Sequence, residues 1–275
     1  MLRLPTIEGI IRRRLLVNFR ADPQVIARLL PSGFRPKLHR GYAIVGICLI
    51  RLEEVRPLGF PRALGMYSEN AAHRIAVEWD ADADCTAATA VTIETNTAPR
   101  IRREGVYIPR RDTGSILNAL AGGRVFPGEQ YHSRFAVEDD GTTIRFSMQS
   151  HELCDYQDSR HAENSRAGES VAIHLEAHTA ASLPDTSVFR SLEEASAYFE
   201  GGCIGYSATC DTIRLDGIEL RTARWEVQPL QVSRVHSSYF RDEKRFPPST
   251  IEFDHALIMR NIPHEWHSIP DYGAA

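Results

Sequence analysis

The stretch GGRVFPGEQYHSRF, residues 122–135, concentrates residue types that can do chemistry. It combines two glycines and Arg124 with the polar cluster Glu129, Gln130, Tyr131 and His132. An arginine can hold a carboxylate by paired hydrogen bonds, and a histidine can move a proton near neutral pH. The stretch contains no lysine, so an amine nucleophile is missing from an otherwise polar, strand-like segment.

Other chemistries have weaker patterns in this sequence. The segment SHELCDYQDSRH contains residue types that bind zinc, but their spacing matches no closed zinc motif. These residues are His151, Glu152, Cys154, Asp155 and His161. The serines of GYS and SS lie in no GxSxG elbow, and GGRVFPG has neither dinucleotide-binding nor P-loop spacing. We therefore predict a solvated loop at residues 151–161, no metal and no cofactor.

Several segments together resemble a known family. They are MYSENAAHR (66–74), residues 105–135, GYSATCDTIRLDGIEL (205–220) and VHSSYFRDEKRFPP (235–248). From about Arg12 onward the chain is similar to the acetoacetate decarboxylase-like superfamily, within the uncharacterised DUF2071 branch. FRADPQVIARLLP resembles the family's N-terminal helix, Tyr67-Ser68-Glu69 its Tyr-x-Glu step, and Gly123-Arg124 the start of the segment that leads to a lysine pair.

The resemblance implies Schiff-base chemistry, which this sequence cannot support at the expected place. The lysine pair should fall between Gly128 and His132, and no lysine occurs there. A Schiff base needs a neutral primary amine, which the permanently charged guanidinium of arginine does not replace. The chain's two lysines, Lys37 and Lys244, lie in a predicted turn and in a charged run, and we expect both to be solvated. The second glutamate of decarboxylases is also missing from residues 43–47.

The resemblance also implies which residues remain at the site. Its upstream arginine falls within the run Arg12–Arg14, where the register among the three stays open and Arg12 is the candidate; Glu69 and Arg124 match its other positions. In the functional interpretation Arg12 or Arg124 holds an anion, with Gln130 and Tyr131 as further ligand contacts, and Glu69 or His132 moves a proton. In the structural interpretation Arg124 and Glu69 neutralise each other, and Tyr131 packs in the core. Both interpretations stay open for Glu69 and Arg124, whereas for Tyr131 we favour packing in the core.

Strands dominate the elements that must position these residues. Strand-like patterns occur at 42–52, 73–79, 142–149, 170–178, 217–227 and 249–259. Helices are expected in ADPQVIARLLPSGF, capped by Asp22, in SLEEASAYFEGG, capped by Ser191, and in GSILNALAGG. We predict a β-rich α+β fold like that of acetoacetate decarboxylase, with a closed β-barrel core, a flanking sheet and a few short helices. It forms a single domain over residues 1–275, with insertions or loops near 80–105 and 156–170.

Composition limits the partners. A net charge of −4 and a pI near 6.3 give no reason to expect nucleic acid. No apolar run has the length of a spanning helix and no signal peptide is evident, so we expect a cytoplasmic protein without a membrane partner. The expected partner is a small molecule such as a carboxylate or keto acid, and a homo-oligomer is compatible with the pattern. The function is either a lysine-independent reaction on such a compound or non-catalytic ligand binding.

Overall fold

The computed structural model describes residues 5–82, 100–116, 119, 128–150, 170–209 and 214–273. The strands are β1 (Ile7–Ala21), β2 (Arg35–Pro36), β3 (Leu38–His39), β4 (Tyr42–Pro57), β5 (Met66–Asp82), β6 (Arg100–Thr113), β7 (Gln130–Asp139), β8 (Thr143–Ser150), β9 (Ala172–Thr179), β10 (Ile204–Ala208), β11 (Leu215–Thr222), β12 (Gln228–Ser237) and β13 (Ile251–Ser268). The helices are α1 (Pro23–Leu29), the short 3-10 helix η1 (Arg62–Leu64) and α3 (Leu192–Glu200).

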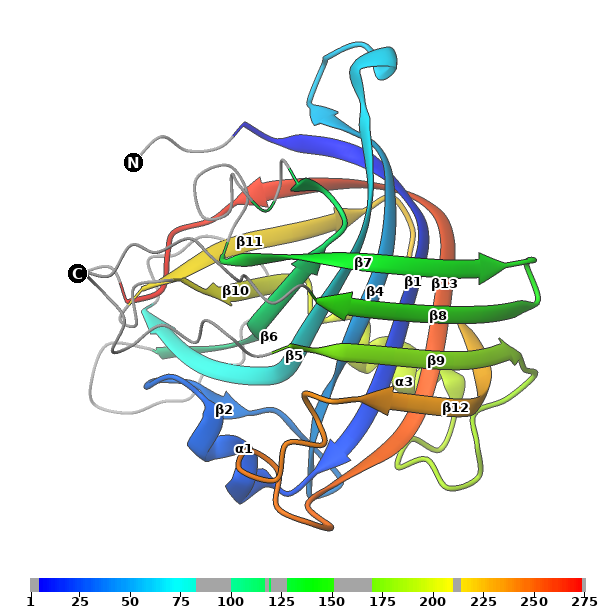
Figure 1. Ribbon diagram of the computed structural model, residues 1–275. Helices are drawn as coiled ribbons and strands as arrows, with labels where there is room; N and C mark the ends of the chain where they lie inside the picture. Colours follow the sequence, from blue (N-terminus) through cyan, green and yellow to red (C-terminus); the bar gives the residue numbers. More distant parts are fainter. Residues whose placement is uncertain are drawn as a thin grey trace.

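Within these ranges, 13 strands form one sheet that closes on itself (Figure 1). The order β6-β7-β8-β9-β12-β13-β1-β4-β5 becomes a ring because β5 also pairs with β6. A second circuit arises because β10 pairs with β6 and β11 pairs with β13. The β-rich α+β fold expected from the sequence is confirmed, and the elements that flank the ring belong to the same continuous sheet.

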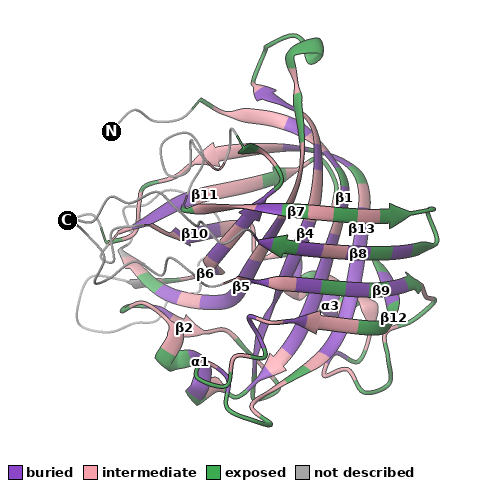
Figure 2. Ribbon diagram, viewed as in Figure 1, coloured by how far each residue is buried: buried purple, intermediate pink, exposed green. Residues whose placement is uncertain are grey.

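Strand alternation divides the apolar residues between two faces of this sheet, as β1 illustrates. Leu15, Val17 and Phe19 join the main core inside the ring, whereas Leu16 belongs to a second cluster with Ala195 and Phe199 of α3. Figure 2 shows that burial is continuous along the middle of β1, β4 and β13. These three long strands are therefore covered on both faces and form a rigid support.

The two described α-helices begin where the sequence predicts. Asp22 caps α1 by accepting a hydrogen bond from the backbone N–H of Gln24 at 2.7 Å. Ser191 caps α3 by accepting one from the N–H of Glu194 at 3.2 Å. The sequence S-x-x-E at Ser191–Glu194 is typical of a capping box, in which the Glu194 carboxylate would accept from the N–H of Ser191. Here the carboxylate accepts from the N–H of Arg190 at 2.6 Å, one residue earlier.

Some boundaries differ from the sequence prediction. The expected loop 80–105 is in part strand, since β5 extends to Asp82 and β6 begins at Arg100. The expected strand 217–227 ends at Thr222. The sequence analysis does not predict the strands β1, β6, β10 and β12, and the strand-like segment 122–135 overlaps only the first part of β7. Residues 83–99, most of the third predicted helix, and residues 151–169, with the metal candidates, lie outside the described residues.

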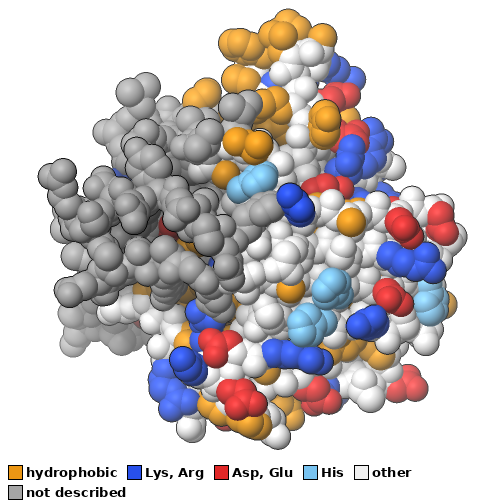
Figure 3. Space-filling model, viewed as in Figure 1, with side chains coloured by type: hydrophobic (Ala, Val, Ile, Leu, Met, Phe, Trp, Pro, Cys, Tyr) orange, Lys and Arg blue, Asp and Glu red, His pale blue; other side chains and the backbone are white. Residues whose placement is uncertain are grey.

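The connection between β4 and β5 projects from the sheet and carries exposed apolar side chains (Figure 3). Leu58, Phe60 and Leu64 are each more than half exposed, at 53%, 55% and 66%. Among the helices that the structure describes, none has the length and apolar character needed to cross a bilayer.

Candidate functional site

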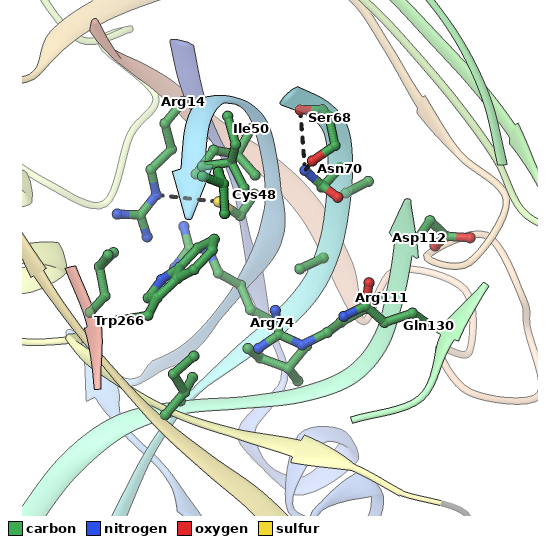
Figure 4. Close-up of a pocket in the computed structure, with 18 of the residues that line it drawn as sticks. Arg14, Cys48, Ile50, Ser68, Asn70, Arg74, Arg111, Asp112, Gln130 and Trp266 are labelled. Atoms are coloured by element: carbon green, nitrogen blue, oxygen red, sulfur yellow. Dashed lines mark hydrogen bonds between the residues drawn. The ribbon is translucent and has the colours of Figure 1, made fainter. Parts of the chain in front are cut away.

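A cavity of about 140 Å³ lies against the face of the sheet opposite the main core, bordered by β1, β4, β5, β6, β11 and β13 (Figure 4). Its walls are largely apolar, and several polar groups interrupt them. The apolar walls include Ile50, Leu52, Val106, Ile108, Ile218 and Trp266. The polar groups include Arg14, Cys48, Asn70, Arg74, Arg111 and Gln130. Apolar walls with a few polar groups are the usual composition of a small-molecule site.

Arg14 enters the cavity from β1. Its Nε donates to the thiol sulfur of Cys48 at 3.3 Å, a contact drawn in Figure 4. Its Nη1 lies 4.0 Å from the sulfur of Met259, and its guanidinium lies 5.8 Å from the ring centroid of Trp225. All of these partners are formally neutral, so the contacts leave the charge of Arg14 uncompensated.

Arg74 comes from β5 and is 6% exposed. Its Nη2 donates to the amide oxygen of Asn18, and its guanidinium lies 5.0 Å from the ring centroid of Phe199. Its Nε has no hydrogen-bond partner among the described residues. Burial lowers the pKa of Arg74 to about 10, with a smaller lowering from Arg14, so the group remains protonated at neutral pH.

Arg111 comes from β6, and its Nε donates to the hydroxyl of Ser207 at 2.9 Å. Burial lowers its pKa to about 10, against smaller opposing effects of Cys48 and Asp216. Gly128 precedes β7 and lies close to Ser207 of β10. Its φ of +77° is readily adopted only by glycine. A Cβ there would lie 2.4 Å from the Cβ of Ser207.

The three guanidinium groups share one electrostatic property. In the described part of the chain, no carboxylate forms an ion pair with Arg14, Arg74 or Arg111. The one carboxylate among the described lining residues, Asp112, is paired with Arg110 at 2.9 Å. The charge of Asp216 acts favourably on Arg111 without forming an ion pair with it. Three buried or half-buried cations without an ion-pair partner are unfavourable by themselves, and such an arrangement favours an anion in the cavity.

The predicted proton-transfer residues lie elsewhere. Glu69 forms ion pairs with Arg13 at 2.7 Å and with Arg51 at 3.4 Å and is absent from the cavity lining. The structural interpretation expects Arg124 as the partner of Glu69, and Arg124 lies outside the described residues, so that pair stays a prediction. His132 is half-buried on β7, where it pairs with Thr113 of β6 in the backbone ladder. A catalytic role for Glu69 or His132 stays a prediction, and this placement adds no support to it.

The predicted ligand-binding residues are divided. Gln130 lines the cavity, whereas Tyr131 lies on another part of the surface with its ring 4.3 Å from the guanidinium of Arg110. Arg12 has a side chain that is 48% exposed and pairs with Glu53 at 2.7 Å. Arg124 lies outside the described residues. Of the six predicted site residues, the structure places Gln130 at the cavity.

The side chains of Arg12, Arg13 and Arg14 point to different places, and one of the three reaches the cavity. Arg12 points to the surface, Arg13 is buried beside Glu69, and Arg14 reaches the cavity. A register shift between Ile11 and Arg13 in the β1–β4 ladder accompanies this change of direction. Sequence reasoning identified the arginine run but chose Arg12, and it missed Arg74 and Arg111. An isolated arginine on one face of a strongly apolar strand is the signal that could have identified Arg74.

The two lysines have different environments. Lys244 is exposed, as expected. Lys37 is not solvated as expected, because its side chain is 15% exposed, its ammonium pairs with Glu104 at 2.7 Å, and it lies 4.2 Å from the ring centroid of Tyr198. It lines a smaller neighbouring cavity that shares Arg14 and Arg74 with the main one. Lys37 lies between β2 and β3, where the sequence predicts a turn, and its side chain contacts Tyr198 of α3.

Comparison with solved structures identifies the class of fold. Acetoacetate decarboxylase from Legionella pneumophila is 11% identical, with a TM-score of 0.55 over 98% of this chain and 90% of that chain. An acetoacetate decarboxylase-like enzyme from Sphingomonas wittichii is also 11% identical, with a TM-score of 0.47 over 96% and 92%. The similarity to the Legionella pneumophila structure shows that the chain has an acetoacetate decarboxylase-like fold.

Within that class, residues 11–77 match the model of DUF2071, a family of uncharacterised conserved proteins. This N-terminal part of the chain is therefore similar to the DUF2071 family. A search among curated proteins found no match.

Proposed function

We propose that this protein binds a small organic anion, a carboxylate or keto acid, in the cavity between β1, β4, β5 and β6. The observation that carries the proposal is the set of three guanidinium groups with neutral partners. Guanidinium groups donate paired hydrogen bonds to carboxylates, and such charge-assisted bonds each contribute about 1.5–3 kcal/mol.

The walls and size of the cavity limit the rest of the ligand. A volume of about 140 Å³ is close to the roughly 150 Å³ of an engineered cavity that holds benzene. Ile50, Ile108 and Trp266 offer apolar contacts next to the arginines. A compact acid with one apolar end, such as a short keto acid or an aromatic acid, has this combination of size and charge.

Chemistry through an imine has no suitable amine at this site. The ammonium of Lys37 forms an ion pair with Glu104 at 2.7 Å. Lys244 is exposed and does not line the cavity. The cavity's described lining contains no histidine, and its one carboxylate is paired. These features favour binding over proton transfer. A lysine-independent reaction with Glu69 and His132 in acid–base roles is the second candidate, and it rests on the resemblance to decarboxylases.

A matched pair of probes tests the binding proposal. Benzoate and benzamide have nearly the same shape and differ in charge, and their dissociation constants are measurable by ligand-observed NMR. We expect benzoate to bind about tenfold or more tightly than benzamide. Arg74→Gln and Arg111→Gln should each remove most of this difference, whereas Arg28→Gln, at an exposed position on α1, should not. Equal binding of the two probes would contradict the proposal.

Incubation with acetoacetate and borohydride tests the chemistry separately. We expect no covalent adduct on Lys37 or Lys244 by peptide mass spectrometry, because neither amine faces the arginines as a free nucleophile. Adduct formation at either lysine would overturn the lysine-independent proposal. Turnover of acetoacetate or pyruvate without an adduct, lost in Glu69→Gln or His132→Gln, would instead favour the second candidate.

A further inference from the structure

A single row of residues crosses four neighbouring strands and ends at the cavity. In the strand ladders His255 of β13 is opposite Asn18 of β1, Asn18 is opposite Gly46 of β4, and Gly46 is opposite Arg74 of β5. Asn18 and His255 are fully buried, and Arg74 is 6% exposed. A polar row inside an apolar sheet is unfavourable unless its hydrogen bonds are satisfied.

The row is connected by side-chain hydrogen bonds in one consistent direction. Arg74 Nη2 donates to Asn18 Oδ1, and Asn18 Nδ2 donates to His255 Nε2 at 3.0 Å and to the carbonyl oxygen of Leu16 at 3.2 Å. Because His255 Nε2 accepts, its proton is on Nδ1, which donates to Asp254 at 2.6 Å. The Asn18 amide can take only this orientation, since a reversed amide would direct N–H groups at Arg74.

Gly46 makes the contact between Asn18 and Arg74 possible. Neighbouring strands lie about 4.8 Å apart, so the backbones of Asn18 and Arg74 are separated by roughly twice that distance, with β4 between them. A Cβ at Gly46 would lie 2.5 Å from the carbonyl oxygen of Val17 and 3.1 Å from Asn18 Oδ1. The glycine therefore leaves the space in which the amide and the guanidinium meet.

The far end of the row is anchored at Asp254. Its carboxylate accepts hydrogen bonds from the hydroxyl of Ser187 at 2.7 Å and from the N–H of Val188 at 2.9 Å, and it lies 3.4 Å from Arg20. Burial alone would raise the pKa of Asp254, but the bonds from His255, Ser187 and Val188 hold it below its usual value. Asp254 therefore stays ionised and fixes the ring of His255, which fixes Asn18.

We propose that Asn18 is a positioning residue that fixes Arg74 through a neutral amide and so keeps the charge of Arg74 available for an anionic ligand. This deepens the proposed function and rests on it. A carboxylate at position 18 would also accept a hydrogen bond from Arg74, but it would neutralise the guanidinium and could not donate to His255 or Leu16. With asparagine at position 18, the only negative charge in the row is on Asp254, and the side chains of His255 and Asn18 separate it from the guanidinium of Arg74. The row therefore sets the preference of the cavity for an anionic ligand and also fixes the position of the Arg74 guanidinium.

Asn18→Asp tests this role directly, because it keeps the shape of the side chain and adds a charge. We expect the preference for benzoate over benzamide to fall at least about tenfold, with benzamide affinity unchanged. Asn261→Asp is the matched control, since it adds the same charge to an exposed residue of β13 beside Arg12. It should keep the wild-type preference. Thermal melts establish that each variant is folded.

The possible results separate the two proposals. A wild-type protein with no preference for benzoate contradicts the proposed function. A wild-type preference that persists in folded Asn18→Asp overturns the role of Asn18 and leaves the proposed function standing. If Asn18→Asp does not fold, Asn18→Ala decides: a reduced preference supports positioning of Arg74, and an unchanged preference overturns it. A merely structural role for Asn18 would lower the melting temperature without changing the ratio of the two affinities.

Discussion

At the scale of single residues, the partners of an arginine decide what it can do. Arg12 and Arg13 are paired with Glu53 and Glu69, so their charges are satisfied within the protein. Arg14, one residue further, is bonded to the sulfur of Cys48. Residue type is the same in all three cases, and only the direction of the side chain distinguishes a surface ion pair, a buried ion pair and a candidate ligand contact.

The thiol of Cys48 offers a chemical probe of the cavity's potential. Iodoacetate and iodoacetamide alkylate thiols by the same displacement of iodide, and they differ in charge. Because Cys48 faces Arg14, we expect its ratio of iodoacetate to iodoacetamide rates to exceed that of glutathione by about tenfold. Arg14→Gln should bring the ratio close to that of glutathione, whereas Arg28→Gln should not. Peptide mass spectrometry measures both rates, and a ratio like that of glutathione in the wild-type protein would argue against a cationic cavity.

At the scale of elements, long strands and α3 hold the arginines in place. The face of β1 that carries Arg14 also carries Leu16, which belongs to one apolar cluster with Ala195 and Phe199 of α3. Alternation places Cys48 and Ile50 of β4, and the side chains of Asn70 and Arg74 of β5, on this same face. The helix covers the sheet beside the cavity, so its stability affects how firmly this face is closed.

Removal of the N-cap of α3 measures that contribution. In Ser191→Ala the N–H of Glu194 loses its hydrogen-bond acceptor, and we expect a loss of about 1 kcal/mol in the free energy of unfolding. Ser233→Ala, at an exposed position on β12, should change it by less than about 0.5 kcal/mol. Urea unfolding gives both values. A change in Ser191→Ala no larger than that in Ser233→Ala would show that the cap is dispensable.

At the scale of the whole molecule, closure of the sheet creates the site. Trp266 of β13 and Arg111 of β6 are far apart in the sequence, and they meet at one cavity because β11 pairs with β13 while β10 pairs with β6. Closure also buries polar residues inside the ring. His73 is fully buried, with Nε2 3.2 Å from the hydroxyl of Ser237 and its ring 4.3 Å from that of Tyr239.

The burial of His73 links global stability to pH. Burial, with smaller effects of Arg110 and Arg245, lowers the pKa of His73 to about 3. An unfolded histidine titrates near 6.5, so between these values the unfolded state binds one more proton. Stability from neutral His73 is therefore complete above about pH 6.5 and is lost as pH falls, by up to about 1.4 kcal/mol per pH unit.

Substitution of His73 isolates this linkage. In His73→Gln the decline of the unfolding free energy between pH 6.5 and 4 should be shallower than in the wild-type protein by up to one proton equivalent. His178→Gln, at an exposed position on β9, should leave the slope unchanged. Denaturant unfolding at several pH values measures the slopes. Identical slopes for His73→Gln and the wild-type protein would show that the pKa of His73 is not lowered by folding.

The sequence by itself determined the local features of this protein. Alternating apolar residues in 42–52 and 249–259 predicted the long strands β4 and β13, and Asp22 and Ser191 predicted the starts of α1 and α3. These features depend on neighbours a few residues away, so a local pattern is sufficient. The missing lysine in Gly128–His132 could likewise be read directly from the residues.

Only the tertiary structure decided which polar residues share a site. Glu69 and Gln130 were predicted together, but strand alternation directs Glu69 to Arg13 and Gln130 to the cavity. The contact between Asn18 and Arg74 depends on two strand registers, β1 against β4 and β4 against β5, and on the empty space above Gly46. A shift of one residue in either of these ladders would reverse the faces and separate the pair. Register is fixed by the packing of the whole sheet, which no short segment contains.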